Sequence, residues 1–459
     1  MSRLAWFSPA PPSTSGIAAY SAELLPLLTR RGHVVDTFTD TNAHDFVWKQ
    51  RRNAYDLTVF HMGNAQCHDY MWAYLFRYPG LVVLHDAQLH QARALFLTKR
   101  WKPRRDDYLA EFRANHPEAP ADAGELVAAG LGGSLYHHWP LVRLVMDSAR
   151  MTVVHNARLR DELSEKHPGA RIDAIEMGVR DPGEQCEVRS AECGVRVPGA
   201  ESEVRVHSAE CDVRAAARVP REAILLAAFG GITPEKRIGP IIRALSAVAE
   251  RQPLLHFLLV GSPASHYDVM EDAARWGVAD RMHVAGFVRD EELSAYLQAA
   301  DICACLRWPS NRETSASWLR CLAAGRATMM TDLSHLGDIP TVDPRGWRVL
   351  DAIGGAREPV AVSIDLLDEE HSLQLAIERL AVDAPMRERL GRAGRAWYEA
   401  HHRLEPMADA YERIIATAAA LPAPRVALPA HLTDDSSHHA RMLADSIGVS
   451  DRLVDVFGT

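Results

Sequence analysis

Short apolar segments alternate with longer amphipathic segments along most of this chain. In its first part, runs rich in Val, Ile, Leu and Phe are each followed by stretches in which apolar residues recur every three or four positions. This alternation is typical of a parallel β-sheet whose strands are joined by crossover helices. We therefore expect a first α/β domain, with strands at residues 4–7, 34–40, 56–61, 80–86 and 151–156.

The segment between the first two of these strands has the signals of a helix. Ile17, Tyr20, Leu24 and further leucines recur at helical spacing, Ser15 precedes them as a candidate cap, and Gly32 follows as a stop. A strand, a loop of small residues and a helix, in that order, form a corner that can face a ligand.

A second series of apolar segments has the same plan. It predicts a second α/β domain, with strands at residues 223–230, 254–261, 281–287, 300–308 and 327–332. Two helical stretches follow residue 385 and precede a tail interrupted by prolines. The expected division of the chain is therefore 1–182, an intervening segment at 183–220, 221–396, a helix at 397–420 and a tail at 421–459.

Residues 183–220 differ from both domains because they contain few large apolar side chains. They include an imperfect repeat, CEVRSAECGVR and SEVRVHSAECDVR, whose two SAEC copies begin 18 residues apart. A single duplication is too short for a solenoid, which needs about three stacked units. We interpret this segment as a flexible or loosely ordered insertion between the domains.

Composition narrows the choice of partners and location. The chain has 459 residues, of which 47% are hydrophobic and 24% charged, and its formal charge is −9, so no basic excess indicates nucleic acid. Seven cysteines occur without a Cys-x-x-Cys pair, which favours reduced thiols over a disulfide framework or a zinc site. The sequence contains no apolar run of membrane-spanning length and its start does not resemble a signal peptide, so we expect a cytoplasmic protein.

Polar residues follow several of the expected strands. Ligands of open parallel sheets bind outside the carboxyl ends of the strands, so these residues are the first candidates for a site. The first domain contributes residues after its first, third and fourth strands, and the second domain contributes the loops that contain Lys236 and Glu313. The first-domain candidates are Ser15, Gly16, His61, Asn64, His85, Asp86 and His90.

The segment FGGITPEKR at residues 229–237 places two cations where a helix begins. Lys236 and Arg237 oppose the helix dipole there, which costs a few tenths to about 1 kcal/mol each. A bound diphosphate would reverse this sign, because it is attracted both to the cations and to the free backbone N–H groups. The alternative interpretation is two solvated basic residues.

The segment ETSASWLRCLAAG at residues 313–325 predicts a second helix start. Thr314 and Ser315 can cap a helix that stops at Gly325, and the N–H groups of residues 314–316, ending with Ala316, can receive a phosphate. Glu313, just before the helix, can accept hydrogen bonds from sugar hydroxyls. The alternative is an ordinary capped helix without a ligand.

His85 ends a nearly continuous apolar strand, where a neutral imidazole can donate or accept a hydrogen bond. A histidine in such a place is more often a core residue than a catalyst. His90 and Asp86 raise the alternative of a metal site, but His85 and His90 are five residues apart and do not share a helix face. We therefore expect no metal.

Taken in order, these segments resemble the family 4 retaining glycosyltransferases of the GT-B fold. The likeness covers the chain to about residue 420, without the insertion, and rests on the six segments PPSTSGIAAYSAELLPLLTRRGHVV, VVLHD, GGITPEKR, LLVG, RMHVAGFVRDEELSAYLQAADIC and ETSASWLRCLAAG. It implies two Rossmann-like α/β/α domains that face each other across a cleft. The second would hold a nucleotide-diphosphate sugar donor, the first would hold the acceptor, and the last helices would return to the first.

The resemblance also implies roles for single residues. Gly16 would lie against the donor phosphates, His85 near the reacting sugar, Lys236 at the diphosphate and Glu313 at the sugar hydroxyls, so that His85, Lys236 and Glu313 form the catalytic set. The other donor-binding candidates are Gly231, Arg237, Thr314, Ser315, Ala316 and Arg320. The acceptor-side candidates are Ser15, His61, Asn64, Asp86 and His90.

Two positions depart from the family pattern. Gly231 stands where the family usually has an arginine, for which Arg237 or Arg307 could substitute, and Arg320 stands near the place of a glutamate that holds the ribose. These departures support a second hypothesis, a catalytically degenerate scaffold that binds a nucleotide sugar or polysaccharide. A third is another GT-B enzyme, an epimerase or a phosphorylase. A nicotinamide dehydrogenase is disfavoured because SPAPPSTSG lacks the Gly-x-Gly-x-x-Gly spacing.

The favoured hypothesis is therefore a retaining, hexosyltransferase-type enzyme with a nucleotide-diphosphate sugar as co-substrate. It would need neither a metal nor another cofactor, because cations and a helix N-terminus can stabilise the leaving diphosphate. The family likeness implies a glycan or lipid-linked acceptor of polysaccharide biosynthesis. A lipid-linked acceptor would bring the protein to the inner face of the cell membrane.

Overall fold

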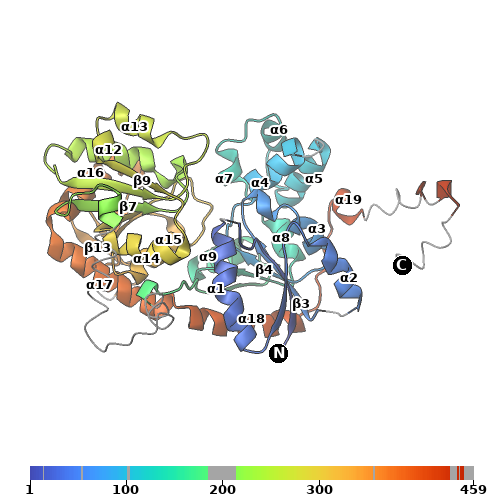
Figure 1. Cartoon of the computed structure of the whole chain (residues 1–459). Helices are drawn as coiled ribbons and strands as arrows, with labels where there is room; N and C mark the ends of the chain where they lie inside the picture. Colours follow the sequence, from blue (N-terminus) through green and yellow to red (C-terminus); the bar gives the residue numbers. More distant parts are fainter. Residues whose placement is uncertain are drawn as a thin grey trace.

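Two lobes, each built on a parallel sheet with helices against it, make up the chain (Figure 1). The computed structural model describes all residues except 14, 53–54, 101–103, 184–212, 355–356, 435–441, 444 and 449–459. Most of the expected insertion at 183–220, with both SAEC copies, lies outside the described residues. Within the described part of the chain, every helix is too short or too polar to span a membrane.

The first lobe contains a six-stranded sheet in the order β2-β1-β3-β4-β5-β6, and all of its neighbouring strands are parallel. The five expected strands are confirmed, and a short edge strand, β6, is added. Ser15 caps the first helix by accepting a hydrogen bond from the backbone of Ile17, and Gly32 follows its end with a φ of 90°. The strands are β1 (Arg3–Phe7), β2 (Val34–Phe38), β3 (Leu57–Met62), β4 (Leu81–Leu84), β5 (Met151–Val154) and β6 (Ile172–Ala174).

Between β4 and β5 the chain forms a group of helices, α4 to α8, of which α5, α6 and α7 stand at the top of the first lobe in Figure 1. This group has a small core of its own around Tyr108 and Phe112. The helices of this lobe are α1 (Gly16–Arg30), α2 (His44–Arg52), α3 (Met71–Arg77), α4 (His90–Leu95), α5 (Arg105–Asn115), α6 (Ala123–Ala128), α7 (Leu135–His138), α8 (Arg143–Ser148) and α9 (Ala157–Lys166).

The second lobe contains an eight-stranded sheet in the order β13-β12-β14-β11-β10-β7-β8-β9. Its five expected strands are also confirmed, and only the pair of β12 and β13 is antiparallel. The end of the expected insertion packs onto this sheet, because Val213 and Val219 are buried in its core. The strands are β7 (Ile224–Phe229), β8 (Leu255–Val260), β9 (Met282–Gly286), β10 (Ile302–Cys305), β11 (Ala327–Thr331), β12 (Thr341–Asp343), β13 (Arg348–Leu350) and β14 (Ala361–Ile364).

The C-terminal helices connect the two lobes. Helix α17 packs on the second lobe against α15 and β11, and α18 then contacts α1 of the first lobe (Figure 1). The four cysteines in the described part of the chain are free thiols. The helices after the first lobe are α12 (Ile238–Val248), α13 (Val269–Arg275), α14 (Asp290–Ala299), α15 (Ala316–Ala323), α16 (Glu369–Val382), α17 (Ala384–His401), α18 (Leu404–Ala420) and α19 (Ala430–Thr433).

One apolar core spans the junction between the lobes. It contains Trp6 of β1, Leu322 of α15 and Tyr411 of α18, all of them buried. Within it, the hydroxyl groups of Tyr411 and Tyr20 are 2.7 Å apart and form a buried hydrogen bond. The return of α18 to the first lobe is therefore fixed by a polar contact as well as by apolar packing.

We expect Tyr411→Phe to lower the free energy of unfolding by about 1–3 kcal/mol, because it leaves the buried hydroxyl of Tyr20 without its partner. Urea unfolding followed by circular dichroism measures this change. The double variant Tyr20→Phe/Tyr411→Phe is the control, since it removes both hydroxyls and should cost less than the sum of the two single variants. Additive losses would contradict a direct hydrogen bond.

Candidate functional site

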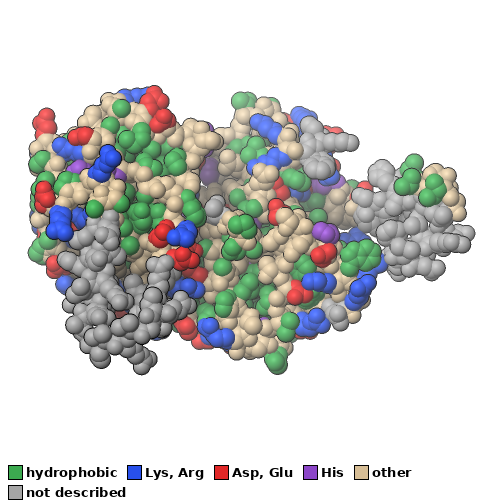
Figure 2. Space-filling model, viewed as in Figure 1, with side chains coloured by type: hydrophobic (Ala, Val, Ile, Leu, Met, Phe, Trp, Pro, Cys, Tyr) green, Lys and Arg blue, Asp and Glu red, His purple; other side chains and the backbone are tan. Residues whose placement is uncertain are grey.

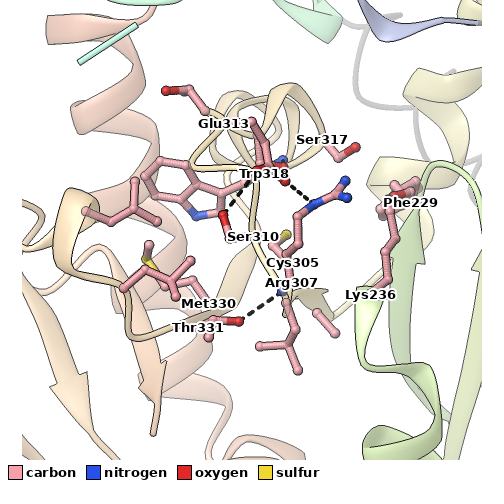
Figure 3. Close-up of a pocket in the computed structure, with 16 residues that line it drawn as sticks. Phe229, Lys236, Cys305, Arg307, Ser310, Glu313, Ser317, Trp318, Met330 and Thr331 are labelled. Carbon is pink, nitrogen blue, oxygen red and sulfur yellow. Dashed lines mark hydrogen bonds and ion pairs between the residues drawn. The ribbon is translucent and has the colours of Figure 1, made fainter. Parts of the chain in front are cut away.

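A pocket opens at the carboxyl ends of three strands of the second lobe. Phe229 ends β7, Cys305 ends β10 and Thr331 ends β11, and all three line the pocket (Figure 3). The loop after β10, the first turn of α15, and Leu333 and Leu336 after β11 form further parts of the wall. This is the edge at which open parallel sheets bind their ligands.

Lys236 reaches the pocket from a single helical turn, Pro234–Lys236. Its ammonium group donates a hydrogen bond to the carbonyl oxygen of Phe229. Gly230 makes room for it, because a Cβ there would lie 2.6 Å from the Lys236 nitrogen, and its φ of 90° also favours glycine. Burial, together with the charge of Arg307, lowers the pKa of Lys236 to about 8.

Arg307 is the second cation of the pocket, and Arg237 is directed elsewhere. In Figure 3 the guanidinium of Arg307 lies between Glu313 and Lys236. It forms an ion pair with Glu313, whose other oxygen accepts a hydrogen bond of 3.1 Å from Ser310. Arg237 instead pairs with Glu369 of α16, with 2.7 Å between its Nε and the carboxylate. Of the two arginines proposed to replace the missing charge, Arg307 lines the pocket.

The first turn of α15 forms another part of the wall. Ser315 caps this helix by accepting a hydrogen bond of 3.3 Å from the backbone of Trp318, as its sequence predicts. The hydroxyl oxygen of Thr314 is buried and has no hydrogen-bond partner among the described residues. A ligand with hydroxyl or phosphate oxygens could satisfy this atom, because Thr314 lines the pocket.

Arg320 and Gly231 lie outside the lining of this pocket. Arg320 extends from α15 to the first lobe, where its guanidinium is 2.8 Å from the carboxylate of Glu23 on α1. Gly231 is exposed in the turn after β7. Gly16 is exposed at the first position of α1, and a Cβ there would have no atom within 4 Å.

A chain of three buried histidines ends at the carbonyl oxygen of Ile175. Nδ1 of His155 lies 3.1 Å from this oxygen, and its Nε2 lies 3.2 Å from Nδ1 of His85. Nε2 of His85 lies 2.9 Å from Nδ1 of His61. A carbonyl oxygen only accepts hydrogen bonds, so neutral His155 must carry its proton on Nδ1. Its Nε2 then accepts from Nδ1–H of His85, and Nε2 of His85 accepts from Nδ1–H of His61 in the same way.

Burial keeps the three rings neutral. Burial lowers the pKa of His155 to about 4 and lowers the pKa values of His61 and His85 well below the usual range. Both ring nitrogens of His85 are bonded to other histidines, so neither is left for a ligand in this arrangement. His90 lies apart from this chain, with its Nε2 2.8 Å from the hydroxyl of Tyr108 in the core of the helical group.

Asp86 and Asn64 contact the second lobe through the loop after β10. The carboxylate of Asp86 accepts a hydrogen bond of 2.6 Å from the backbone of Asn64, whose side-chain nitrogen lies 3.3 Å from the side-chain oxygen of Asn311. The backbone oxygen of Asn311 accepts a further bond of 2.8 Å from Ala87. Burial and, after it, the charge of Glu313 raise the pKa of Asp86 to about 7.

Sequence reasoning did not assign Asn311, Ser310 or His155. Asn311 and Ser310 belong to the same polar stretch as Glu313, and this closeness in the sequence could have indicated that they belong to the site. His155 ends its strand in the same way as His85, and the parallel alignment of β4 with β5 brings the two rings together.

We expect the effect of Asp86→Asn on the free energy of unfolding to be more stabilising at pH 8 than at pH 5. The folded chain retains the Asp86 proton up to about pH 7, whereas the unfolded chain releases it near 3.8, so stability falls as pH rises through this window. The difference in unfolding free energy between the variant and the unmutated protein should grow by roughly 2 kcal/mol. Urea unfolding at both pH values measures it.

The matched control is Asp122→Asn, at an exposed carboxylate that makes no side-chain capping bond. Its difference in unfolding free energy from the unmutated protein should not increase between pH 5 and pH 8. An Asp86→Asn difference that is equal at pH 5 and pH 8 would contradict the raised pKa.

Comparison with known proteins agrees with this architecture. Residues 223–350 match the family model described as glycosyl transferases group 1. A search of curated proteins finds no match to the chain. Among solved structures, sucrose-phosphate synthase from Thermosynechococcus elongatus is similar at 15% identity and a TM-score of 0.59, over 91% of this chain and 100% of that chain.

Two other solved structures resemble the chain to a similar degree. HepE from Anabaena, in complex with UDP and glucose, has 12% identity and a TM-score of 0.57, over 91% of this chain and 100% of that chain. WaaG, a glycosyltransferase involved in lipopolysaccharide biosynthesis, has 14% identity and a TM-score of 0.56, over 90% of this chain and 99% of that chain. The chain therefore has the GT-B glycosyltransferase fold, with a glycosyl transferases group 1 domain in its second lobe.

Proposed function

We propose that this protein is a retaining glycosyltransferase that moves a sugar from a nucleotide-diphosphate sugar to a glycan or lipid-linked acceptor. The observation that carries the proposal is the meeting of Lys236, Arg307 and the first turn of α15 in one pocket of the second lobe. Two cations in a partly buried pocket repel each other, and a diphosphate would neutralise both. The backbone N–H groups that begin α15, apart from that of Trp318, which Ser315 caps, have no acceptor within the helix and add to this attraction.

The similar structures support a nucleotide sugar as the ligand. HepE from Anabaena is in complex with UDP and glucose in one structure and with UDP-glucose in another. In our proposal a corresponding donor lies in the pocket of Figure 3, with its diphosphate at Lys236 and Arg307 and its sugar hydroxyls at Glu313. The ion pair between Arg307 and Glu313 then opens, because each partner gains a contact with the donor.

The proposed reaction breaks the bond between the anomeric carbon and the diphosphate oxygen. The electron pair leaves with the diphosphate, and Lys236, Arg307 and the start of α15 stabilise the charge that develops there. The acceptor oxygen bonds to the anomeric carbon on the face from which the diphosphate departs, which retains the configuration. Its proton passes to the departing phosphate oxygen. No step of this proposal passes through a metal or another cofactor.

The first lobe supplies the opposite wall in this proposal. His85 lies near the reacting sugar and acts by position, because its two ring nitrogens are bonded to His61 and His155. Gly16, at the start of α1, allows the donor phosphates to approach the backbone. Gly231 stands where the family usually has an arginine, and Arg307 supplies that charge instead. Arg320 contributes to the contact between the lobes. We place the enzyme in the cytoplasm, at the inner face of the membrane when its acceptor is lipid-linked.

We expect Lys236→Ala to weaken UDP binding about 10- to 100-fold, since a charge-assisted contact to the diphosphate contributes about 1.5–3 kcal/mol. Titration calorimetry with UDP, GDP and ADP on the unmutated protein and the variant measures this, and release of the nucleotide from its sugar tests turnover. The control is Lys49→Ala, which removes an exposed lysine of the first lobe. Normal turnover in Lys236→Ala would contradict the role of this lysine.

Binding of a nucleotide without turnover, for every donor and acceptor tried, would favour the degenerate scaffold over the enzyme. Failure of UDP, GDP and ADP alike to bind the unmutated protein would contradict both.

We expect UDP to bind about tenfold more weakly at pH 9 than at pH 7. The pKa of Lys236 is about 8, and a bound diphosphate favours its charged form, so affinity falls as this lysine loses its proton. Calorimetry at both pH values measures the change. The Lys236→Ala variant is the control, because it retains any effect of the ionisation of uracil and loses that of the lysine. Equal pH dependence in both proteins would show that the lysine does not titrate in this range.

A further inference from the structure

A second pocket adjoins the first between the two lobes. Ser310 of the loop after β10 and Leu333, which follows β11, line both pockets, so the two adjoin at these residues. The first lobe contributes Gln88 and His137 to the second pocket, and the second lobe contributes Trp308 and His335. In the space-filling view the lobes meet along a seam, and histidine side chains are visible in its upper part (Figure 2).

Three buried polar atoms of this pocket lack partners. The side-chain oxygen of Gln88, Nδ1 of His137 and Nε2 of His335 have no hydrogen-bond partner among the described residues. Gln88 is 7% exposed and His335 is 4% exposed, so water reaches them poorly. Buried polar atoms without partners are costly, and three of them around one pocket indicate a ligand that supplies hydrogen bonds.

The same pocket offers no free charge. Its one arginine, Arg312, is held by Glu162 of α9 in a two-point ion pair. Burial and, after it, the charge of Arg312 lower the pKa of His335 to about 4, so this imidazole is neutral at pH 7. No carboxylate is among the described residues that line the pocket. These groups fit hydroxyls, which donate and accept, better than a phosphate or a carboxylate.

Trp308 gives the pocket an apolar surface. Its side chain is 45% exposed, and the next residue, Pro309, also lines the pocket. The backbone N–H of Trp308 donates a hydrogen bond of 2.7 Å to the carbonyl of Glu235, the residue before Lys236. The loop that carries the aromatic ring is thus hydrogen-bonded to the turn that carries Lys236. A sugar ring has an apolar face of C–H groups and a rim of hydroxyls, which matches an aromatic surface bordered by neutral polar atoms.

We propose that this second pocket binds the terminal ring of a neutral glycan acceptor. The ring stacks on Trp308, and its hydroxyls bond to Gln88, His137 and His335. The inference rests on the proposed function and adds the acceptor's chemical class. Ser310, at the junction of the two pockets, lies beside the hydroxyl that attacks, because its own hydroxyl bonds to Glu313 of the donor pocket.

The test measures two kinds of ligand on the same protein. Calorimetry first gives the affinity for UDP, and saturation-transfer NMR on the UDP-loaded protein then measures binding of the methyl glycosides of glucose, galactose and mannose. Glucose 6-phosphate serves as the charged probe, and octyl β-glucoside represents a lipid-linked sugar. The variants are Trp308→Ala and Gln88→Leu, with Trp276→Ala as the matched control, because Trp276 is 43% exposed at the far end of α13.

We expect at least one neutral methyl glycoside to bind, and Trp308→Ala to weaken it about tenfold without changing the affinity for UDP by more than about twofold. Gln88→Leu should also weaken it, and Trp276→Ala should not. Octyl β-glucoside should lose affinity in the same two variants, and tighter binding of this probe than of methyl β-glucoside would indicate a lipid-linked source.

Binding of UDP without any neutral glycoside, stronger binding of glucose 6-phosphate, or an unchanged affinity in Trp308→Ala would each overturn this inference and leave the donor site standing. Failure of UDP to bind would overturn the donor site, and the inference with it. The separate UDP measurement therefore distinguishes the two failures.

Discussion

The repulsion between Lys236 and Arg307 is the constraint on which the site depends. Both cations lie in one pocket at the carboxyl end of the second sheet, and burial and, after it, the charge of Arg307 lower the pKa of Lys236. The protein offsets this with a backbone carbonyl, that of Phe229, and one carboxylate, that of Glu313. A diphosphate, which the proposed function places in this pocket, would compensate the two cations more fully than these partners do.

The loop at residues 306–313 connects this constraint to the other lobe. It carries Arg307 and Glu313, which line the first pocket, and Trp308, which lines the second. The same loop contacts the first lobe, because the backbone oxygen of Asn311 accepts a hydrogen bond from Ala87. A shift of one lobe against the other would therefore move the groups of both pockets together, and in the proposed function this would link donor binding to the shape of the acceptor pocket.

The sequence predicts local features of this site better than long-range ones. Alternating apolar segments identify ten strands, but β12 and β13 are three residues long and have no apolar run to reveal them. The cap at Ser315 follows from neighbouring residues. Neighbouring residues do not reveal the different roles of Arg237 and Arg307, because the partner of Arg237 is Glu369, 132 residues away in the sequence. The partner of His90, Tyr108, is likewise fixed only by the packing of the helical group.

The two walls of the cleft differ in charge, and this difference has a structural cause. The histidine chain of the first lobe is anchored on a carbonyl oxygen, which fixes the position of the proton on each ring. Burial keeps His61, His85 and His155 neutral. With Asp86 able to hold its proton near neutral pH, the first lobe adds little charge to the cleft. Lys236 and Arg307 are the cations among the described residues that line the first pocket, and in the proposed function they draw a charged donor to the second lobe and leave a neutral acceptor to the surface between the lobes.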